Sequence, residues 1–248
     1  MVENGRYCLG EDQLITLKMQ GGLGNRLFQY CSARILAENS NLYLYSPRVE
    51  GFNQTKRVHL GKVATGRFQK ITGHALPSYV DQRTVLEGYF QRIELLDAHR
   101  DKVNKWLEPK VLGPSVQSYE SDLTLSVRRG STGWPIELCP TIDYYLDLLK
   151  GFEFTKLWIT TDSPRDEFFT PLLKKYPAAQ IVDLGVLEQF KFIQNSCRII
   201  VAPSTFSVLA SWSSRAKNIY WPKIQALDFS RTEHNWFSDT DLRNEYIG

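Results

Sequence analysis

Residues 14–30 constrain the fold of this chain more than any other segment. They open with an apolar run, 14–17, which has the composition of a buried strand. Glycines follow at positions 21, 22 and 24. Beyond them apolar residues recur at helical spacing, at Leu27, Phe28, Tyr30, Cys31, Ile35 and Leu36. A strand, a glycine loop and a helix in this order present backbone N–H groups to an anionic ligand, and glycine permits the close approach.

The loop departs from the two common nucleotide-binding fingerprints. Gly22-Leu23-Gly24 supplies a G-x-G, but Leu27 stands where the third glycine of the dinucleotide motif belongs, and no Lys-Ser/Thr pair of a P-loop follows. Bare glycine patterns also occur in ordinary tight turns. The pattern is therefore open to two interpretations, an anion-binding loop or a structural turn between a strand and a helix.

Composition excludes several classes of protein. The net charge of +3, from 30 basic and 27 acidic residues, gives no basis for a nucleic-acid surface. The four cysteines lie far apart without a C-x-x-C pair, which argues against zinc and fits a reducing compartment. The N-terminus is polar and no apolar run reaches the ~18–20 residues of a membrane span, so we expect a cytoplasmic protein without a transmembrane segment.

The patterning favours two regions. In the first, Pro109 and the Gly113-Pro114 pair end the regular pattern, so we expect an N-terminal lobe over residues 1–112. Its expected elements are the strand and helix described above, strands at 42–45 and 84–90, a helix at 95–106, and short elements and loops over 46–82.

The second region alternates regularly between strand and helix patterns. The alternation predicts right-handed βαβ units and a parallel sheet over residues 113–228, followed by a tail or helix over 229–248. The expected strands are 123–127, 156–161, 180–184, 198–202 and 218–221, and the expected helices are 142–149, 167–176, 186–194 and 206–214.

Polar residues gather just past the expected strands, where open α/β sheets bind ligands. Arg128 and Arg129 follow one strand, and a guanidinium there suits a bidentate contact to phosphate, although a surface arginine pair is the alternative. Asp162 follows the next strand, as either a ribose acceptor or a helix cap. Ser204 and Thr205 precede a helix, as either an anion site or its cap.

Metal-binding patterns are weak. Asp239-Thr240-Asp241 has the D-x-D form of some glycosyltransferases, but it follows no expected strand, and we interpret it as a solvated tail. The four histidines are scattered singly. We expect no metal site.

These motifs together resemble the GDP-fucose-dependent α-1,2-fucosyltransferases, within the wider fucosyltransferase superfamily. The similar segments are GGLGNRLFQY at 21–30, EGYFQ at 87–91, TDSP at 161–164 and FIQNSCRIIVAPSTFSVLASWSS at 192–214. One motif departs. Where the family reads H-x-R-R-G-D, this chain keeps both arginines and the glycine but has Ser126 and Ser131 in place of the histidine and the aspartate.

The resemblance implies an α/β, GT-B-like enzyme with two Rossmann-like lobes and a nucleotide-sugar cleft between them. The implied reaction is the inverting, metal-independent transfer of L-fucose from GDP-β-L-fucose to a glycan hydroxyl, α-1,2 to galactose, with no cofactor. The implied donor-binding residues are Gly21, Gly22, Gly24, Asn25, Arg128, Arg129, Asp162, Ser204, Thr205 and Phe206. Arg128 and Asn25 are the catalytic candidates among them.

The catalytic base and the exact donor stay open. Glu87, Glu137 and Asp143 are candidates for the base because they lie in or near motif segments. The departures at Ser126 and Ser131 leave two alternatives to fucosyl transfer. One is an enzyme of the same fold that uses another GDP-6-deoxyhexose or a related nucleotide sugar, and the other is a non-catalytic sugar- or nucleotide-binding homologue.

Overall fold

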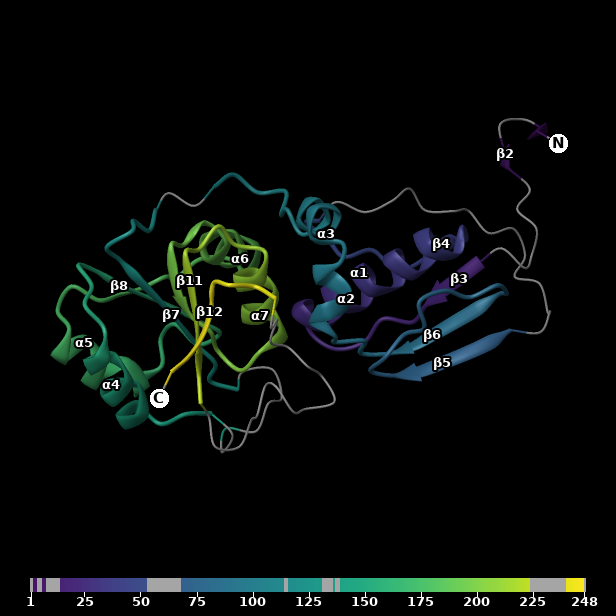
Figure 1. The fold of residues 1–248 in the computed structure, drawn as a ribbon. Helices are drawn as coiled ribbons and strands as arrows, with labels where there is room; N and C mark the ends of the chain where they lie inside the picture. Colours follow the sequence, from purple (N-terminus) through teal and green to yellow (C-terminus); the bar gives the residue numbers. More distant parts are fainter. Residues whose placement is uncertain are drawn as a thin grey trace. The chain divides into compact units, whose positions relative to one another are not determined.

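The computed structural model divides the chain into two compact units, each of which is described by itself (Figure 1). Unit 1 comprises Met1–Glu50 and Gln54–Trp106, and unit 2 comprises Gly51–Asn53 and Leu107–Gly248. Within these units the structure describes residues 2–3, 6–7, 14–52, 68–113, 116–130, 136, 139–223 and 240–247.

Unit 1 contains a parallel sheet of four described strands. They are β3 (Leu14–Leu17), β4 (Tyr43–Tyr45), β5 (Gln69–Gly73) and β6 (Thr84–Gly88), in the order β4-β3-β6-β5. A separate pair, β1 (Val2–Glu3) and β2 (Arg6–Tyr7), is antiparallel. Ile15 and Leu86 are fully buried in the parallel sheet, as its apolar strand pattern predicts.

Helix α1 (Leu23–Ser40) contacts β3 and β4 and buries most of the apolar residues that the helical spacing predicted. It begins at Leu23, so Gly24 and Asn25 lie in its first turn instead of in the preceding loop. It ends at Ser40, and its C-cap Asn41 has a left-handed backbone (φ 52°) that closes the last turn.

The segment expected as one helix at 95–106 forms two. Helix α2 (Ile93–Asp97) and helix α3 (Arg100–Trp106) are separated by a turn in which the N–H of His99 donates to Leu96 O. The turn redirects the chain so that Leu96 and Val103 are both fully buried. Helical spacing alone does not distinguish one long helix from two short helices that share a core.

Unit 2 contains a six-stranded sheet that is parallel throughout, as the alternation of patterns predicted. Its order is β12-β11-β10-β7-β8-β9. The strands are β7 (Leu123–Val127), β8 (Leu157–Thr161), β9 (Gln180–Ile181), β10 (Arg198–Ile200), β11 (Asn218–Pro222) and β12 (Asn244–Ile247). Counted from β7 as the first strand, this is the 3-2-1-4-5-6 order of dinucleotide-binding folds.

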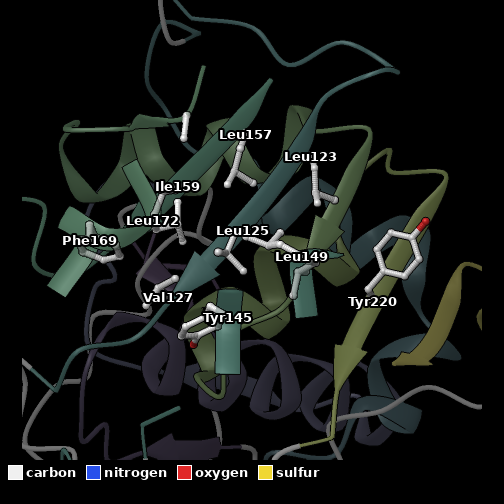
Figure 2. Close-up of a cluster of buried hydrophobic side chains, with 12 residues drawn as sticks. Leu123, Leu125, Val127, Tyr145, Leu149, Leu157, Ile159, Phe169, Leu172 and Tyr220 are labelled. Carbon is white, nitrogen blue, oxygen red and sulfur yellow. The ribbon is translucent and has the colours of Figure 1, made fainter. Parts of the chain in front are cut away.

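Helices cover both faces of this sheet, as a buried parallel sheet requires. The helical elements are α4 (Ile142–Leu148), η2 (Leu149–Gly151), η3 (Glu167–Phe169), α5 (Thr170–Lys175), α6 (Val186–Asn195) and α7 (Thr205–Trp212). Figure 2 shows the core beneath α4 and α5, where Leu125 and Val127 of β7 meet Tyr145 and Leu172. On the other face Trp158 packs edge-on against Phe192 of α6.

Two features of this sheet differ from the prediction. Strand β9, an edge strand that pairs with β8 alone, stops at Ile181, three residues earlier than expected. Residues 244–247, expected within a tail or helix, form β12 beside β11. The Nε1–H of Trp221 donates to Asn244 Oδ1 at 3.0 Å, a contact that local sequence does not reveal.

Among the residues that the structure describes, no helix combines the length and the apolar character needed to cross a bilayer.

The carboxyl ends of β5 and β6 approach too closely for a side chain at Gly88. A Cβ there would lie 2.2 Å from the carbonyl oxygen of Gly73, a backbone atom that cannot move aside cheaply. We expect Gly88→Ala to destabilise the protein by about 1–3 kcal/mol, measured by urea unfolding. The control is Gly151→Ala, where a Cβ would meet nothing within 4 Å. Equal unfolding midpoints for the two variants would contradict the expected clash.

Candidate functional site

The topology of unit 2 brings two of the expected donor-binding segments to one edge of the sheet. Strand β7 pairs with β10 in parallel, with Ile200 opposite Leu125. Strands β8 and β9 lie on one side of β7, and β10, β11 and β12 lie on its other side, so the order of strands switches between β7 and β10. Open α/β sheets bind ligands at such a switch point, outside the carboxyl ends of the strands. Arg128 follows β7 directly, and Ser204 lies just past β10.

The two adjacent arginines have different surroundings. The Nε–H of Arg129 donates to Asp166 Oδ2 at 2.8 Å, and its guanidinium lies 3.7 Å from the centroid of the Phe168 ring. Arg129 therefore packs on the face of the sheet that α5 covers, in phase with Val127. The alternation of side chains along the strand assigns Arg128, which is half-buried, to the opposite face with Ser126.

Asp162 joins the ends of β7 and β8. Its Oδ1 accepts the backbone N–H of Arg129 at 2.8 Å, and the residue is otherwise exposed. The cap that we considered for Asp162 belongs instead to Asp166, whose carboxylate accepts the N–H of Phe168 at the start of η3. The carboxyl end of the second strand is also where dinucleotide-binding folds place the acid that binds ribose.

Ser204 is the N-cap of α7. Its hydroxyl oxygen accepts the N–H of Ser207 at 3.1 Å, which confirms the capping interpretation. Phe206 packs edge-on against Phe190 of α6, with ring centroids 5.3 Å apart, and Thr205 is half-buried beside it. The cap and the aromatic contact hold the first turn of α7 in place, while anion binding by this turn stays a prediction.

Ser126, which stands in place of the family's histidine, is 3% exposed and shares a hydrogen bond of 2.9 Å with Thr160 of β8. It therefore belongs to the interior of the sheet. Ser131 lies outside the described residues.

A pocket of about 510 Å³ lies beside Asp162, at the carboxyl ends of β8 and β9. Residues 163–166 and Asp183 line it. Sequence reasoning missed Asp183 because it lies inside the strand expected at 180–184. In the structure β9 ends at Ile181, so Asp183 lies just past a strand end, as Asp162 does. A second pocket, of about 620 Å³, runs between α4 and strands β11 and β12, and no expected site residue lines it.

The glycine loop of unit 1 is held by Gln29, a fully buried residue of α1. Its side-chain amide exchanges two hydrogen bonds of 2.9 Å with the backbone of Gln20, one as acceptor and one as donor. Gly21 has φ +78°, and a Cβ there would lie 2.4 Å from Asn25 Nδ2. Gly22 is the N-cap of α1 without a side-chain cap, and a Cβ there would meet nothing within 4 Å.

Asn25 has a partner from a distant part of the chain. Its Oδ1 accepts from Nε2 of Gln91 at 2.8 Å, and Gln91 is 4% exposed. Arg26, where the family usually carries glutamine, donates from Nε to Gly21 O at 2.9 Å. Three side chains of α1 therefore converge on this loop, those of Asn25, Arg26 and Gln29.

The three candidates for the catalytic base differ in their surroundings. Glu87 lies 3.1 Å from both Lys70 Nζ and Lys18 Nζ, and these two ammonium groups lower the pKa of its carboxyl group. Asp143 is exposed in the first turn of α4, where a negative charge complements the helix dipole. Glu137 lies outside the described residues.

The described residues contain no group of three or more His, Cys, Asp or Glu side chains that could hold a metal ion. Within the D-x-D segment, both carboxylate oxygens of Asp241 accept from the Arg243 guanidinium, at 2.8 and 2.6 Å. Asp239 lies outside the described residues.

No protein-family model and no curated protein matches this chain in sequence. Solved structures do match in fold. The chain has the fold of the fucosyltransferase NodZ. The selenomethionine NodZ structure from Bradyrhizobium aligns with a TM-score of 0.53 at 13% identity, over 86% of this chain and 96% of NodZ.

Two further structures of NodZ, an α-1,6-fucosyltransferase, were soaked with GDP-fucose and co-crystallised with GDP. Each aligns with a TM-score of 0.50 at 12% identity, over 84% of this chain and 94% of NodZ. The likeness confirms the predicted fold class, α/β and GT-B-like with two parallel sheets. At this level of identity it shows the fold alone.

The ion pair between Asp166 and Arg129 makes stability depend on pH. The N–H of Phe168 and then the Arg129 guanidinium lower the pKa of the Asp166 carboxyl group. A lowered pKa stabilises the fold above the unfolded-state value of about 3.9, and this stabilisation is lost as the pH falls through the folded-state value.

We therefore expect Asp166→Asn, which keeps a capping side chain, to cost roughly 0.5–1 kcal/mol at pH 7. Urea unfolding from pH 7 to pH 2.5 should show this cost shrinking below about pH 4. Asp147→Asn is the control, because the Asp147–Lys150 pair is exposed and contributes little. A cost for Asp166→Asn that does not vary with pH would contradict the assigned ion pair.

Proposed function

We propose that this chain is a glycosyltransferase that moves L-fucose from GDP-β-L-fucose to a hydroxyl group of a glycan acceptor. The observation that carries the proposal is the parallel pairing of β7 with β10 at the switch point of unit 2, because Arg128 follows the first of these strands and the start of α7 follows the second. A guanidinium and a helix N-terminus together suit a diphosphate. The fold match to NodZ, whose structures include one soaked with GDP-fucose, supports the choice of donor.

In this proposal Arg128 neutralises the diphosphate while Ser204, Thr205 and Phe206 form the cradle at the start of α7. Arg129 is not assigned as a direct ligand of the donor, because its guanidinium contacts Asp166 and the ring of Phe168. It supports the site through its backbone N–H, which fixes Asp162.

The choice of guanine has its own physical support. Asp162 is assigned to the ribose, and Asp183 lines the adjacent pocket as a hydrogen-bond acceptor. The carboxylate oxygens of Asp166, which also lines the pocket, already accept from Arg129 and from the N–H of Phe168. Guanine presents two neighbouring donors, N1–H and N2–H, which a carboxylate can accept together. In unit 1 the loop of Gly21, Gly22 and Gly24 with Asn25 is assigned to phosphate or sugar oxygens of the donor.

The chemistry follows from these residue types. Fucosyl transfer develops positive charge on the sugar and negative charge on the departing GDP, so fixed donors near the diphosphate lower the barrier. Arg128 does this without a metal, since a guanidinium stays charged and binds phosphate in a bidentate way. We propose an inverting, metal-independent reaction with α-1,2 linkage to galactose. Glu87 is the weakest candidate for the base, because its two lysine partners favour the ionised form at the expense of basicity.

A second candidate keeps the fold and uses another GDP-6-deoxyhexose or a related nucleotide sugar. The departure at Ser131 motivates it. The departure at Ser126 does not motivate it, because Ser126 is buried in the sheet and hydrogen-bonded to Thr160, away from a bound ligand. A non-catalytic sugar- or nucleotide-binding homologue is the third reading, and turnover of any GDP-sugar excludes it.

The first test is nucleotide selectivity. We expect GDP and GDP-fucose to stabilise the protein by about 2.7 kcal/mol at ~100 times Kd, and UDP or UDP-sugars to give less. Thermal shift measures this, and GDP release from GDP-fucose should continue in excess EDTA. Equal stabilisation by UDP-sugars would refute the guanine assignment, and activity that EDTA abolishes and Mn²⁺ restores would refute metal independence.

The second test compares the two arginines. Arg128→Lys keeps the charge but loses the planar fork, so we expect kcat/KM to fall by about 10²-fold with an unchanged unfolding midpoint. Arg129→Lys should lower the unfolding midpoint and affect kcat/KM less, since it breaks the contacts to Asp166 and Phe168. A large loss of kcat/KM in Arg129→Lys alone would assign the diphosphate to Arg129 instead. Wild-type kcat/KM in both variants would refute the proposal that an arginine binds the diphosphate.

A further inference from the structure

The hydrogen bond between the half-buried Asn25 and the buried Gln91 joins two parts of unit 1 that lie 66 residues apart in the sequence. Asn25 is in the first turn of α1, and Gln91 follows β6. Gln91 is 4% exposed, and a buried amide adopts the orientation that satisfies its hydrogen bonds. The contact therefore couples the orientations of the two amide groups.

The direction of this bond determines which atom of Asn25 faces the glycine loop. An asparagine amide carries an acceptor oxygen on one side and a donor nitrogen on the other. Because Oδ1 accepts from Gln91, Nδ2 lies on the opposite side, next to Gly21. The reverse orientation would turn a carbonyl oxygen toward the loop, where it would repel phosphate or sugar oxygens.

The backbone around Gln91 is itself held by α1. Phe90 has φ +49°, an uncommon conformation for an aromatic residue, and is 1% exposed. Its carbonyl oxygen accepts from Ser32 Oγ at 3.1 Å. Strained backbone of this kind persists where the surroundings determine it, and it is concentrated at functional sites. Helix α1 thus fixes the turn that carries Gln91, and Gln91 in turn orients Asn25 on the same helix.

We propose that Gln91 is a positioning residue for donor binding. It holds the Asn25 amide so that Nδ2 donates to an oxygen of the diphosphate or the sugar of a GDP-sugar. The inference rests on the proposed function and adds to it a residue that acts through Asn25.

Gln91→Glu tests the orientation with almost no change in shape. A carboxylate accepts and does not donate, so Nδ2 of Asn25 turns toward it and Oδ1 turns toward the loop. At pH 8 we expect the Kd for GDP or for GDP-fucose to rise, and kcat/KM to fall, by roughly 10- to 100-fold. Gln91→Met, which imposes neither orientation, should give a smaller loss.

The pH profile separates positioning from simple structural damage. Burial raises the pKa of an introduced carboxyl group, and its protonated form can donate to Asn25 Oδ1 again. The defect of Gln91→Glu should therefore shrink as the pH falls from 8 to 5.5, relative to wild type at each pH. The defect of Gln91→Met should not change with pH.

Two controls complete the experiment. Gln194 is 6% exposed and donates to Leu107 O and Ser213 Oγ in unit 2. Gln194→Glu buries a carboxyl group elsewhere, so it should lower the unfolding midpoint and leave GDP binding unchanged. In an Asn25→Ala background, Gln91→Glu should add no further loss, because the residue through which it acts is gone.

The results that would overturn the positioning role of Gln91 differ from the result that would overturn the proposed function. Wild-type GDP binding and turnover in Gln91→Glu would overturn the positioning role alone. So would equal, pH-independent losses in Gln91→Glu and Gln91→Met, or a full further loss in the Asn25→Ala background. A wild-type protein that neither binds GDP nor turns over any GDP-sugar would overturn the proposed function and this inference with it.

Discussion

Parallel pairing of β7 with β10 is the constraint on which the candidate site of unit 2 depends. In a parallel sheet every strand ends at the same edge, so residues that follow different strands meet there however far apart they lie in the sequence. Arg128, Asp162, Asp183 and Ser204 share this edge for that reason. Successive strands are added to one side of β7 from β7 to β9 and to its other side from β10 onward. This switch leaves room outside the shared edge, because the helices that follow β7 and β10 lie on opposite faces of the sheet.

The regular pattern of unit 2 made much of its fold predictable. Alternating apolar strands and amphipathic helices identify βαβ units, and their shared edge predicts where a ligand binds. Strand order was not predictable, because it depends on which non-local pairings bury the most surface. Strand β12 was missed for the same reason, since its sequence, Asn-Glu-Tyr-Ile, has no apolar alternation and it pairs with β11 alone.

Residue types at strand ends were predictable, but their roles were not. Two adjacent arginines look equivalent in the sequence, yet Arg129 is committed to Asp166 and Phe168. Only the alternation of side chains along the strand assigns Arg128 to the other face. Likewise Asp162 and Asp166 both suited a helix cap, and the capping hydrogen bond belongs to Asp166. The cap of Asp166 is local, but the bonds that Arg129 makes to Asp162 and Asp166 join segments more than thirty residues apart, which a pattern along the chain cannot encode.

The two units hold the N-terminal turn of a helix, α7 in unit 2 and α1 in unit 1, by different contacts. In unit 2 the first turn of α7 has a local side-chain cap, Ser204, and the contact of Phe206 with Phe190 adds to it. In unit 1 the N-cap is Gly22, which has no side chain, and the loop is held by Gln29 and by the pairing of Asn25 with Gln91. A glycine cap leaves the backbone open to a ligand but makes no side-chain hydrogen bond. The helix start is held instead by the amide side chains of Gln29, Asn25 and Gln91. Glutamine and asparagine suit that task because an amide both donates and accepts, so one buried contact determines which atom is presented at the loop.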